Sequence, residues 1–230
     1  MELNQSDKCV LMFSGGRDST IAAMRLSKMF KHLILVTVIS EHLVGIRRVH
    51  QRIMQLKKYL PKETEWVQVI LPKFTIKEQL LNVTCLPCQR AYIVTGTIIA
   101  RRNNISNLAM GYSGYQNSWP EQTPYATGGL RKLLKIKGIQ LHLPVYRIKE
   151  KDYALDELTR LGLKKESYEQ KCLKQKYNVD LDEEILKTEI DKWIDGISEI
   201  IQSKNKVTLD IRFHGRISDI VDLPSKTQKL

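Results

Sequence analysis

The first thirty residues constrain the fold of this chain more than any other stretch of its sequence. Residues 9–13 form a short apolar run with the character of a buried strand, and residues 20–30 repeat apolar side chains at near-helical spacing. Between them lies a tight turn with the sequence SGGRDS, residues 14–19, here called the glycine loop. A strand, a turn and the start of a helix bring backbone N–H groups together, where they can bind an anion. We therefore expect an α/β protein whose first loop binds an anion.

The side chains of the glycine loop refine this expectation. Ser14 and Ser19 supply hydroxyl donors, while Gly15 and Gly16 let the backbone approach a ligand without a Cβ in the way. Asp18 is unusual in an anion site, because a carboxylate repels phosphate, and a divalent cation between the two would remove the conflict. The loop is shorter than a Walker-type loop and lacks its lysine. The alternative is an ordinary glycine-rich turn capped by serine.

Strand-like and helix-like segments alternate along the rest of the chain. Apolar runs typical of buried strands occupy residues 10–13, 33–39, 66–71, 107–110 and 139–144, with a terminal strand at 207–213. Helical spacing marks residues 20–30, 45–60, 89–103, 132–134, 151–161 and 181–203. This alternation is typical of a doubly wound, mostly parallel, Rossmann-like sheet, which binds ligands at the carboxyl ends of its strands. The glycine loop, Ser40 and residues 111–115 are therefore expected to meet at that edge.

Composition limits the partners and the compartment. The net charge of +12 suits a nucleotide, tRNA or DNA, and equally suits plain solubility through lysine-rich faces. No apolar stretch approaches the roughly 20 residues needed to cross a bilayer, and there is no signal pattern, so we expect a cytoplasmic protein without membrane contact. Four cysteines in such a chain argue against a disulfide scaffold, and Cys9 fits a small core residue.

The expected domain organisation is simple. One sizeable α/β domain spans residues 1–178, and a helix and tail, residues 179–230, pack on it or extend it. There are no repeats and no low-complexity linker. The apolar face of residues 181–203 can cover the chain's own sheet or bind a second copy in a homodimer.

The run SGGRDS resembles the SGGxDS signature of the PP-loop ATP pyrophosphatases, which cleave ATP between its α and β phosphates and form adenylated intermediates. The resemblance implies an adenine nucleotide alpha hydrolase-like fold that binds ATP and Mg²⁺. In such a site the loop binds the β and γ phosphates, and Asp18 is one of the groups that bind Mg²⁺. Arg17 adds positive charge near the leaving pyrophosphate. The implied catalytic residues are Asp18, Arg17 and Ser19. The implied nucleotide site consists of Ser14, Gly15, Gly16, Arg17, Asp18, Ser19, Ser40 and Gly111.

A polar, glycine-containing segment with the sequence GYSGYQNSWPE directly follows the fourth predicted strand, and is here called the aromatic segment. Tyr115 or Trp119 can stack on a flat heterocycle. The amide and carboxyl groups of Gln116, Asn117 and Glu121 can read its polar edge. The alternative is that the two aromatic side chains merely anchor a partly buried loop.

The aromatic segment is similar to the SGYPDCRPE signature of 7-cyano-7-deazaguanine synthase, the queuosine-pathway branch of the PP-loop family. The matching residues are Ser113, Gly114, Tyr115, Pro120 and Glu121, while Asn117, Ser118 and Trp119 stand where the signature has Asp, Cys and Arg. Looser similarity extends from residue 9 to about residue 175. The resemblance implies that a 7-deazaguanine carboxylate is adenylated, that ammonia displaces AMP, and that a second activation yields the nitrile.

Three cysteines form a separate pattern, with Cys85 and Cys88 in a C-x-x-C and Cys172 far along the chain. A C-x-x-C can be a redox pair, half of a zinc site or part of an iron–sulfur site, and a third thiolate would complete a three-ligand metal site. Three unrelated reduced thiols are the alternative. The layout is similar to one branch of the PP-loop tRNA thiolases, where it binds a four-iron four-sulfur cluster. That resemblance implies tRNA as the partner and sulfur as the incoming group.

These patterns favour an ATP-dependent ligase of the 7-cyano-7-deazaguanine synthase type, which forms AMP and pyrophosphate, because the match in the aromatic segment is the longer and rarer one. A PP-loop tRNA thiolase with a three-cysteine zinc or iron–sulfur site is the first alternative. A non-catalytic nucleotide-binding module is the second. Asp18 argues against the module, because a sensor has no need of a metal-positioning carboxylate.

Overall fold

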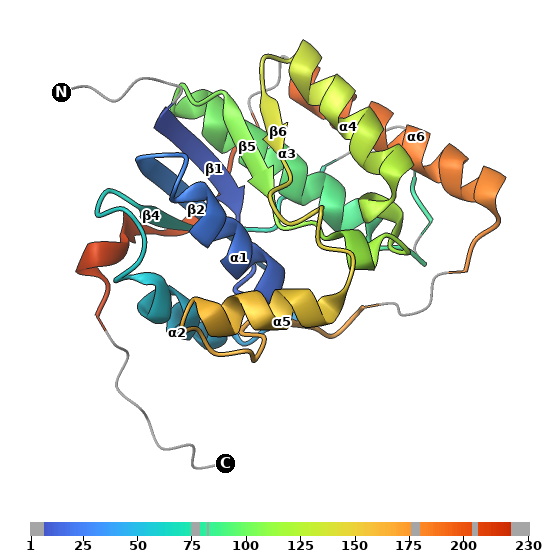
Figure 1. The fold of residues 1–230 in the computed structure, drawn as a ribbon. Coiled ribbons are helices and arrows are strands. Elements are labelled where there is room, and N and C mark those ends of the chain that lie inside the picture. Colours follow the sequence, from blue (N-terminus) through green and yellow to red (C-terminus); the bar gives the residue numbers. More distant parts are fainter. Residues whose placement is uncertain (1–6, 75–78, 82, 176–179, 204–206, 222–230) are drawn as a thin grey trace.

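A six-stranded sheet forms the centre of the structure, a computed structural model that describes residues 7–74, 79–81, 83–175, 180–203 and 207–221 (Figure 1). Within those residues the strand order is β6-β5-β1-β2-β4-β8. The bounds are β1 Lys8–Met12, β2 His32–Ile39, β4 Glu65–Ile70, β5 Asn107–Met110, β6 Gln140–His142 and β8 Ile211–Arg216. Neighbouring strands are parallel except for β8, which is antiparallel to β4. The predicted doubly wound, mostly parallel α/β fold is confirmed.

Strand β1 lies in the interior of the sheet. Val10 pairs with Ile34 of β2 on one side and with Leu108 of β5 on the other. Every residue from Cys9 to Phe13 is buried. A parallel strand that is covered on both faces reads as a continuous apolar run, which is why the sequence pattern identifies it. The glycine loop follows this strand and therefore lies between neighbouring loops at the carboxyl edge.

Helices cover both faces of the sheet (Figure 1). One face carries α1 Arg17–Leu26, α2 Ile46–Leu56 and α5 Lys151–Arg160, and the other carries α3 Leu86–Arg102, α4 Pro124–Ile136 and α6 Glu183–Gln202. Each face of the sheet has its own hydrophobic core, and successive residues of β1 point into opposite cores. Leu11 packs with α1 and α2, while Met12 packs with α3. The helices hold the sheet from both sides and leave its carboxyl edge to the loops.

Helix α4 is much longer than the predicted helix at residues 132–134. Thr123 caps its start, since Thr123 Oγ1 accepts a hydrogen bond from Ala126 N–H at 3.1 Å. Gly128 and Gly129 lie inside the helix and interrupt its apolar spacing in the sequence. Glycine has a low intrinsic helix propensity, so the local sequence disfavours a helix here. The packing of α4 against α6 outweighs this low propensity.

Other bounds also differ from the sequence expectation. Helix α3 begins at Leu86 instead of residue 89, because Pro87 is well suited to a first helical turn. Strand β8 begins at Ile211 instead of residue 207. Two short strands that the sequence does not predict pair with each other in an antiparallel way, β3 Leu43–Val44 and β7 Lys171–Cys172. Two residues are too few to show a strand period.

The C-terminal part of the described chain packs onto the rest. Helix α6 buries Ile190, Trp193 and Ile197 in the core that it shares with α3 and α4. It therefore covers the chain's own sheet, which is one of the two roles expected for it. The predicted boundary at residue 178 lies outside the described residues. Among the helices that are described, none is both long and apolar enough to span a membrane.

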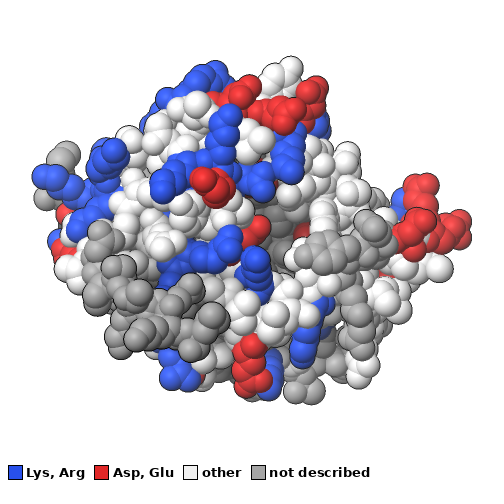
Figure 2. Space-filling model, turned by 90° about the horizontal axis from the view of Figure 1, so that it is seen from below, with Lys and Arg blue, Asp and Glu red and all other residues white. Residues whose placement is uncertain are grey.

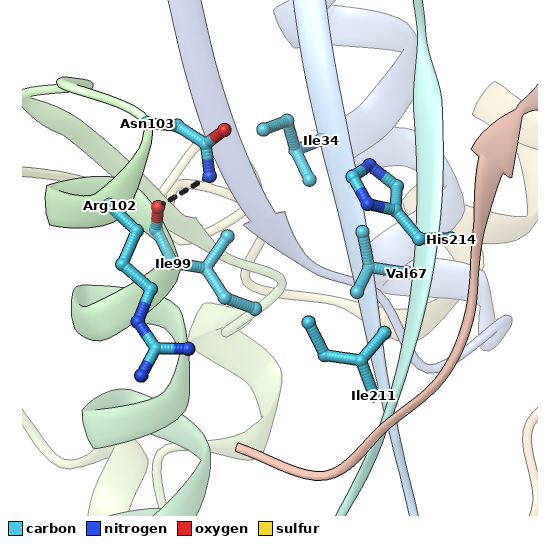
Figure 3. Close-up of a pocket in the computed structure, with 7 residues that line it drawn as sticks. All are labelled: Ile34, Val67, Ile99, Arg102, Asn103, Ile211 and His214. Carbon is cyan, nitrogen blue, oxygen red and sulfur yellow. Dashed lines mark hydrogen bonds between the residues drawn. The ribbon is translucent and has the colours of Figure 1, made fainter. Parts of the chain in front are cut away.

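A small cavity of about 50 Å³ lies between the end of α3 and strands β2, β4 and β8 (Figure 3). Ile34, Val67 and Ile99 face it together with Ile211. Asn103 turns its amide back to the helix, and its Nδ2 donates to Ile99 O at 2.9 Å. The cavity lies toward the amino-terminal ends of β2 and β4, away from the glycine loop. Its size and apolar lining suit a packing void and do not suit a ligand site.

Glu65 ties three strands together near the amino-terminal ends of β2 and β4. His32 Nε2 of β2 lies 2.8 Å from Glu65 Oε1, and His214 Nε2 of β8 contacts Oε2. The hydrogen bond with His32, with help from His214, outweighs burial and lowers the pKa of Glu65 to about 2. The ionised carboxylate therefore holds the antiparallel edge strand to the parallel sheet.

We predict that Glu65→Gln destabilises the fold in a pH-dependent way. A depressed folded-state pKa means that the stabilisation is present above the unfolded value of 4.5 and is lost as the pH falls through 2. Urea unfolding should show a loss of about 1–2 kcal/mol at pH 6 and much less at pH 2.5. Glu63→Gln, which removes an exposed ion pair with Arg216, is the control and should matter little at either pH. Equal losses for Glu65→Gln at both pH values would contradict the prediction.

Candidate functional site

The glycine loop connects β1 to α1 at the carboxyl edge of the sheet. Gly15 has φ +79°, and a Cβ at this position would lie 3.0 Å from Tyr168 O, so both conformation and space require glycine. Helix α1 begins at Arg17, and no side chain in the described part of the chain caps it. The N–H groups of its first turn therefore stay open to an anion.

The serine hydroxyls of the glycine loop bind within the loop itself. Ser14 Oγ accepts a hydrogen bond from Gly16 N–H at 3.1 Å and lies 3.1 Å from Ser19 Oγ. Ser19 Oγ donates to Gly16 O at 3.2 Å. The two hydroxyls brace the turn, and the main chain offers the open donors. A role for either hydroxyl in holding phosphate stays a prediction.

Asp18 joins the glycine loop to the aromatic segment. Asp18 Oδ1 accepts a hydrogen bond from Tyr115 Oη at 2.6 Å, and Ser113 Oγ donates to Oδ2 at 3.4 Å. Burial raises the pKa of Asp18, these hydrogen bonds lower it, the charge of Glu169 raises it, and Arg17 makes the smallest contribution. Neutral donors therefore fix the carboxyl in place, with only weak help from a positive charge.

Gly111 lets the end of β5 approach the first turn of α1. A Cβ on Gly111 would lie 2.9 Å from both the N and Cα atoms of Ser19, which is closer than atoms can pack. The close approach brings the loops after β1 and β5 together, as the topology predicts. It also sets the distance from which Tyr115 reaches Asp18.

Ser40 lies directly after β2 at the same edge, but it contacts a different set of groups. Ser40 Oγ lies 3.1 Å from His42 Nδ1, and His42 Nε2 lies 3.9 Å from Cys88 Sγ. Ser40 is thus linked to the cysteines through His42, and among the described residues its hydroxyl makes no hydrogen bond to the glycine loop. Nothing in the sequence singles out His42 except its place two residues after Ser40.

The aromatic segment folds into two short turns of 3-10 helix, η2 Gly114–Gln116 and η3 Pro120–Gln122. Tyr115 is half-buried and engaged with Asp18, and Gln116 Oε1 accepts a hydrogen bond from Gln122 Nε2 at 3.0 Å. Asn117 is exposed and Trp119 is half-buried. The residues expected to bind a base therefore differ in exposure, and those near Tyr115 lie closest to the glycine loop.

Glu121, the last of these residues, lies inside the protein. It is 3% exposed, and Oε2 has no hydrogen-bond partner among the residues that the structure describes. Burial raises the pKa of Glu121 to about 7. The charge of Glu121 acts on half-buried Tyr92 and on buried Tyr112, and Tyr112 Oη donates to Gln89 Oε1 at 3.0 Å. Below pH 7 the carboxyl is mostly protonated, so it can donate as well as accept.

The fold brings the three cysteines of the sequence pattern into one neighbourhood. Cys85 precedes α3, Cys88 lies in its first turn, and Cys172 belongs to β7, where it pairs with Leu43 of β3. The charges of all three cysteines act on half-buried Tyr92, and burial followed by the charge of Cys172 raises the pKa of Cys88. Within the described ranges, however, no three His, Cys, Asp or Glu side chains are arranged to hold a metal ion.

Residues 164–170, here called the crossing segment, follow α5 and run across the glycine loop. Arg52 of α2 is fully buried, and its Nη2 donates to Lys164 O at 2.9 Å and to Glu166 O at 2.6 Å. Its guanidinium carbon lies 4.5 Å from the centre of the Tyr168 ring, and Tyr168 N–H donates to Gly15 O at 3.2 Å. These anchors join residues that are far apart in the chain, so the sequence pattern does not reveal them.

The fold and the site together define a class of α/β protein. Its sheet is mostly parallel, a glycine loop follows β1, and a carboxylate lies in the first turn of α1. No protein-family model and no curated protein sequence matches the chain. Among solved structures, a 4-thiouridine synthetase in complex with RNA and bound ATP aligns at a TM-score of 0.59 and 16% identity. The alignment covers 89% of this chain and 55% of the synthetase chain. The likeness shows the fold: this chain shares the architecture of the aligned part of that synthetase.

Two other solved structures align more weakly. PH1313 from Pyrococcus horikoshii Ot3 aligns at a TM-score of 0.40 and 14% identity, over 68% of this chain and 42% of that one. A predicted subunit of tRNA methyltransferase from Methanocaldococcus jannaschii aligns at a TM-score of 0.41 and 14% identity, over 74% of this chain and 99% of that one.

We predict that Glu121→Gln stabilises the protein at alkaline pH. A buried acid with a raised pKa stabilises fully only below its unfolded value of 4.5, and that stability is lost as the pH rises through about 7. At pH 8.5 the ionised side chain costs on the order of 3 kcal/mol, which the amide avoids. Thermal unfolding should give Glu121→Gln a higher Tm than wild type at pH 8.5 and a similar Tm at pH 4.5. A lower Tm at pH 8.5 would show that the carboxylate has a partner in the folded protein.

Proposed function

We propose that the chain is an ATP-dependent adenylating enzyme that cleaves ATP to AMP and pyrophosphate. The observation that carries this proposal is the position of Asp18. It lies in the uncapped first turn of α1, next to the open N–H groups, and Tyr115 and Ser113 of the aromatic segment bind it. A site that combines an anion-binding helix start with a fixed carboxylate suits a metal–polyphosphate ligand.

Asp18 supplies the kind of ligand that Mg²⁺ prefers. Mg²⁺ usually takes one or two carboxylates from the protein and completes its shell with phosphate oxygens and water, so a site without a protein cage fits it. Bound there, the ion would neutralise charge on the leaving pyrophosphate. The open N–H groups of α1 would hold the β and γ phosphates, with Ser19 beside them. Arg17, the first residue of the helix, would add positive charge to the same group.

The acceptor we propose is a flat heterocyclic acid of the 7-deazaguanine carboxylate class. Its carboxylate oxygen would attack the α-phosphate of ATP, releasing pyrophosphate, and ammonia would then displace AMP to give the amide; a second ATP would activate the amide oxygen for dehydration to the nitrile. The support is the match of the aromatic segment to that family and its contact with Asp18 through Tyr115. Gln116, Asn117 and Trp119 would border the base, with Glu121 beneath them.

A specific observation favours a second candidate, a tRNA sulfur-transfer enzyme. Cys85, Cys88 and Cys172 share one neighbourhood at the carboxyl edge, where a zinc ion or an iron–sulfur cluster would need the thiols to close around it. The molecule seen from below, the side of α2 and α5, shows Lys and Arg side chains around a central hollow, with some Asp and Glu side chains among them (Figure 2). Lys164, Lys165 and Lys171 are exposed, and such a surface suits an RNA backbone. In either case we propose a cytoplasmic enzyme. We also propose that it can form a homodimer, a prediction that the packing of α6 on the chain's own sheet does not test.

The acceptor is tested by ATP consumption with defined additives. Purified protein with Mg²⁺, ATP and an ammonium salt should consume ATP when 7-carboxy-7-deazaguanine is added, and unmodified tRNA should not replace the acid. Asp18→Asn should lower the rate about 100-fold, because the fixed carboxylate that positions the metal is gone. Asp156→Asn, an exposed carboxylate on α5, is the matched control and should retain the wild-type rate. Stimulation by tRNA alone would replace the first candidate with the second.

The cysteines separate the two candidates by a different route. If the acceptor is a deazaguanine acid, Cys85→Ser, Cys88→Ser and Cys172→Ser should each keep ATP consumption within about twofold of wild type, because these residues belong to the start of α3 and to β7 instead of the glycine loop. Cys9→Ala controls for the loss of a buried thiol in β1. Loss of activity in all three serine variants, together with stoichiometric zinc or iron in anaerobically purified protein, would favour sulfur transfer.

A further inference from the structure

Glu169 is a second carboxylate at the glycine loop, and nothing in the sequence pattern identifies it. A Cβ placed on Gly16 would lie 2.7 Å from Glu169 Oε2 and 3.4 Å from its Cδ, so the carboxylate rests against the backbone of the loop. Its charge also acts on Asp18. Glu169 is exposed, so solvent and a ligand can both reach it.

Several independent contacts place Glu169 there. Tyr168 N–H donates to Gly15 O, which joins the crossing segment to the loop one residue before Glu169. Arg48 Nη2 donates to Ser167 O at 2.5 Å, and Gln170 Nε2 donates to Val38 O at 2.8 Å on the other side. With the buried guanidinium of Arg52 behind them, these bonds fix the backbone on both sides of Glu169.

Two carboxylates beside a polyphosphate site repel each other and repel the phosphates. Arg17 is the cation whose charge is felt at Asp18, and its contribution is the smallest one there. A divalent cation removes both repulsions at once, and Mg²⁺ commonly combines one or two carboxylates with phosphate oxygens. The arrangement therefore favours ATP together with its metal over ATP alone.

We propose that Glu169 is a second metal-positioning carboxylate, which acts with Asp18 to hold Mg²⁺ on the phosphates of ATP. The proposal rests on the proposed ATP-dependent function and extends it to a residue of the crossing segment. It makes the site selective for the metal complex, because free ATP meets two uncompensated negative charges.

Binding of ATP with and without Mg²⁺ tests the role of Glu169 without any need for turnover. Calorimetric titration of Glu169→Gln should show Mg·ATP binding at least about fivefold weaker than wild type, because one metal contact is lost. In EDTA the same variant should bind free ATP at least about threefold tighter than wild type, because one repulsive charge is gone. This opposite response in the two conditions is specific to a carboxylate that positions the metal.

Glu166→Gln is the matched control. It lies on the same crossing segment, where Arg52 binds its main-chain oxygen and its side-chain charge acts on Arg52, whereas the charge that acts on Asp18 is that of Glu169. Glu166→Gln should therefore change neither affinity. Tighter binding by Glu169→Gln in both conditions would mean that Glu169 merely occupies the phosphate position, and unchanged binding in both would mean that it plays no part; either result overturns the proposal.

The same titration separates this proposal from the proposed function. Wild-type protein that binds no ATP in either condition would overturn both. Wild-type protein that binds Mg·ATP, with affinity lost in Asp18→Asn and kept in Glu169→Gln, would overturn only the role of Glu169.

Discussion

The close approach of two backbones is the constraint on which the site depends. At position 111 the chain leaves β5 so near the first turn of α1 that a Cβ would collide with the main chain of Ser19. Because glycine permits this contact, Tyr115 comes within 2.6 Å of Asp18. The carboxylate is then fixed by a neutral donor from a segment almost a hundred residues away. Without that approach, the glycine loop and the aromatic segment would be two separate features of one sheet edge.

The order of the strands explains why so many distant segments meet at this edge. Strand β1 lies between β2 and β5, so the loops that follow all three strands are neighbours. The loop after β1 carries Asp18, the loop after β5 carries Tyr115, and the loop after β2 carries Ser40 and His42. The crossing segment then returns over the glycine loop and adds Glu169. The cysteines lie at the same edge, near β3 and the start of α3, so this edge carries a second group of reactive side chains.

Much of this arrangement could be predicted from the sequence, and the reason is periodicity. Buried parallel strands such as β1 and β2 are continuous apolar runs, and the SGGRDS turn between a strand and a helix has a direct physical meaning. The sequence therefore predicts the fold class and the place of Asp18. Helix α4 was harder to foresee, since Gly128 and Gly129 break its pattern while a cap and tertiary packing restore the helix.

What the sequence could not predict depends on contacts between distant residues. His42 stands alone in the sequence, and only the short pairing of β3 with β7 brings it beside the cysteines. Glu169 is held at the glycine loop by hydrogen bonds that the Arg48 and Arg52 side chains donate to backbone carbonyls of the crossing segment, and such contacts leave no local pattern. Glu121 belongs to a polar segment that was expected to read the edge of a heterocycle, and the packing of η3 against α3, α4 and α6 buries it. In each case the local sequence does not indicate where the side chain lies, because tertiary packing determines its position.

The identity of the phosphorus-containing products tests the central claim most directly. When the protein turns over Mg·ATP with its acceptor, ³¹P nuclear magnetic resonance should show AMP and pyrophosphate in equal amounts, because the glycine loop holds the β and γ phosphates as one leaving group. ADP and inorganic phosphate as the primary products would contradict the account, since cleavage would then fall between the β and γ phosphates that the loop is proposed to keep together.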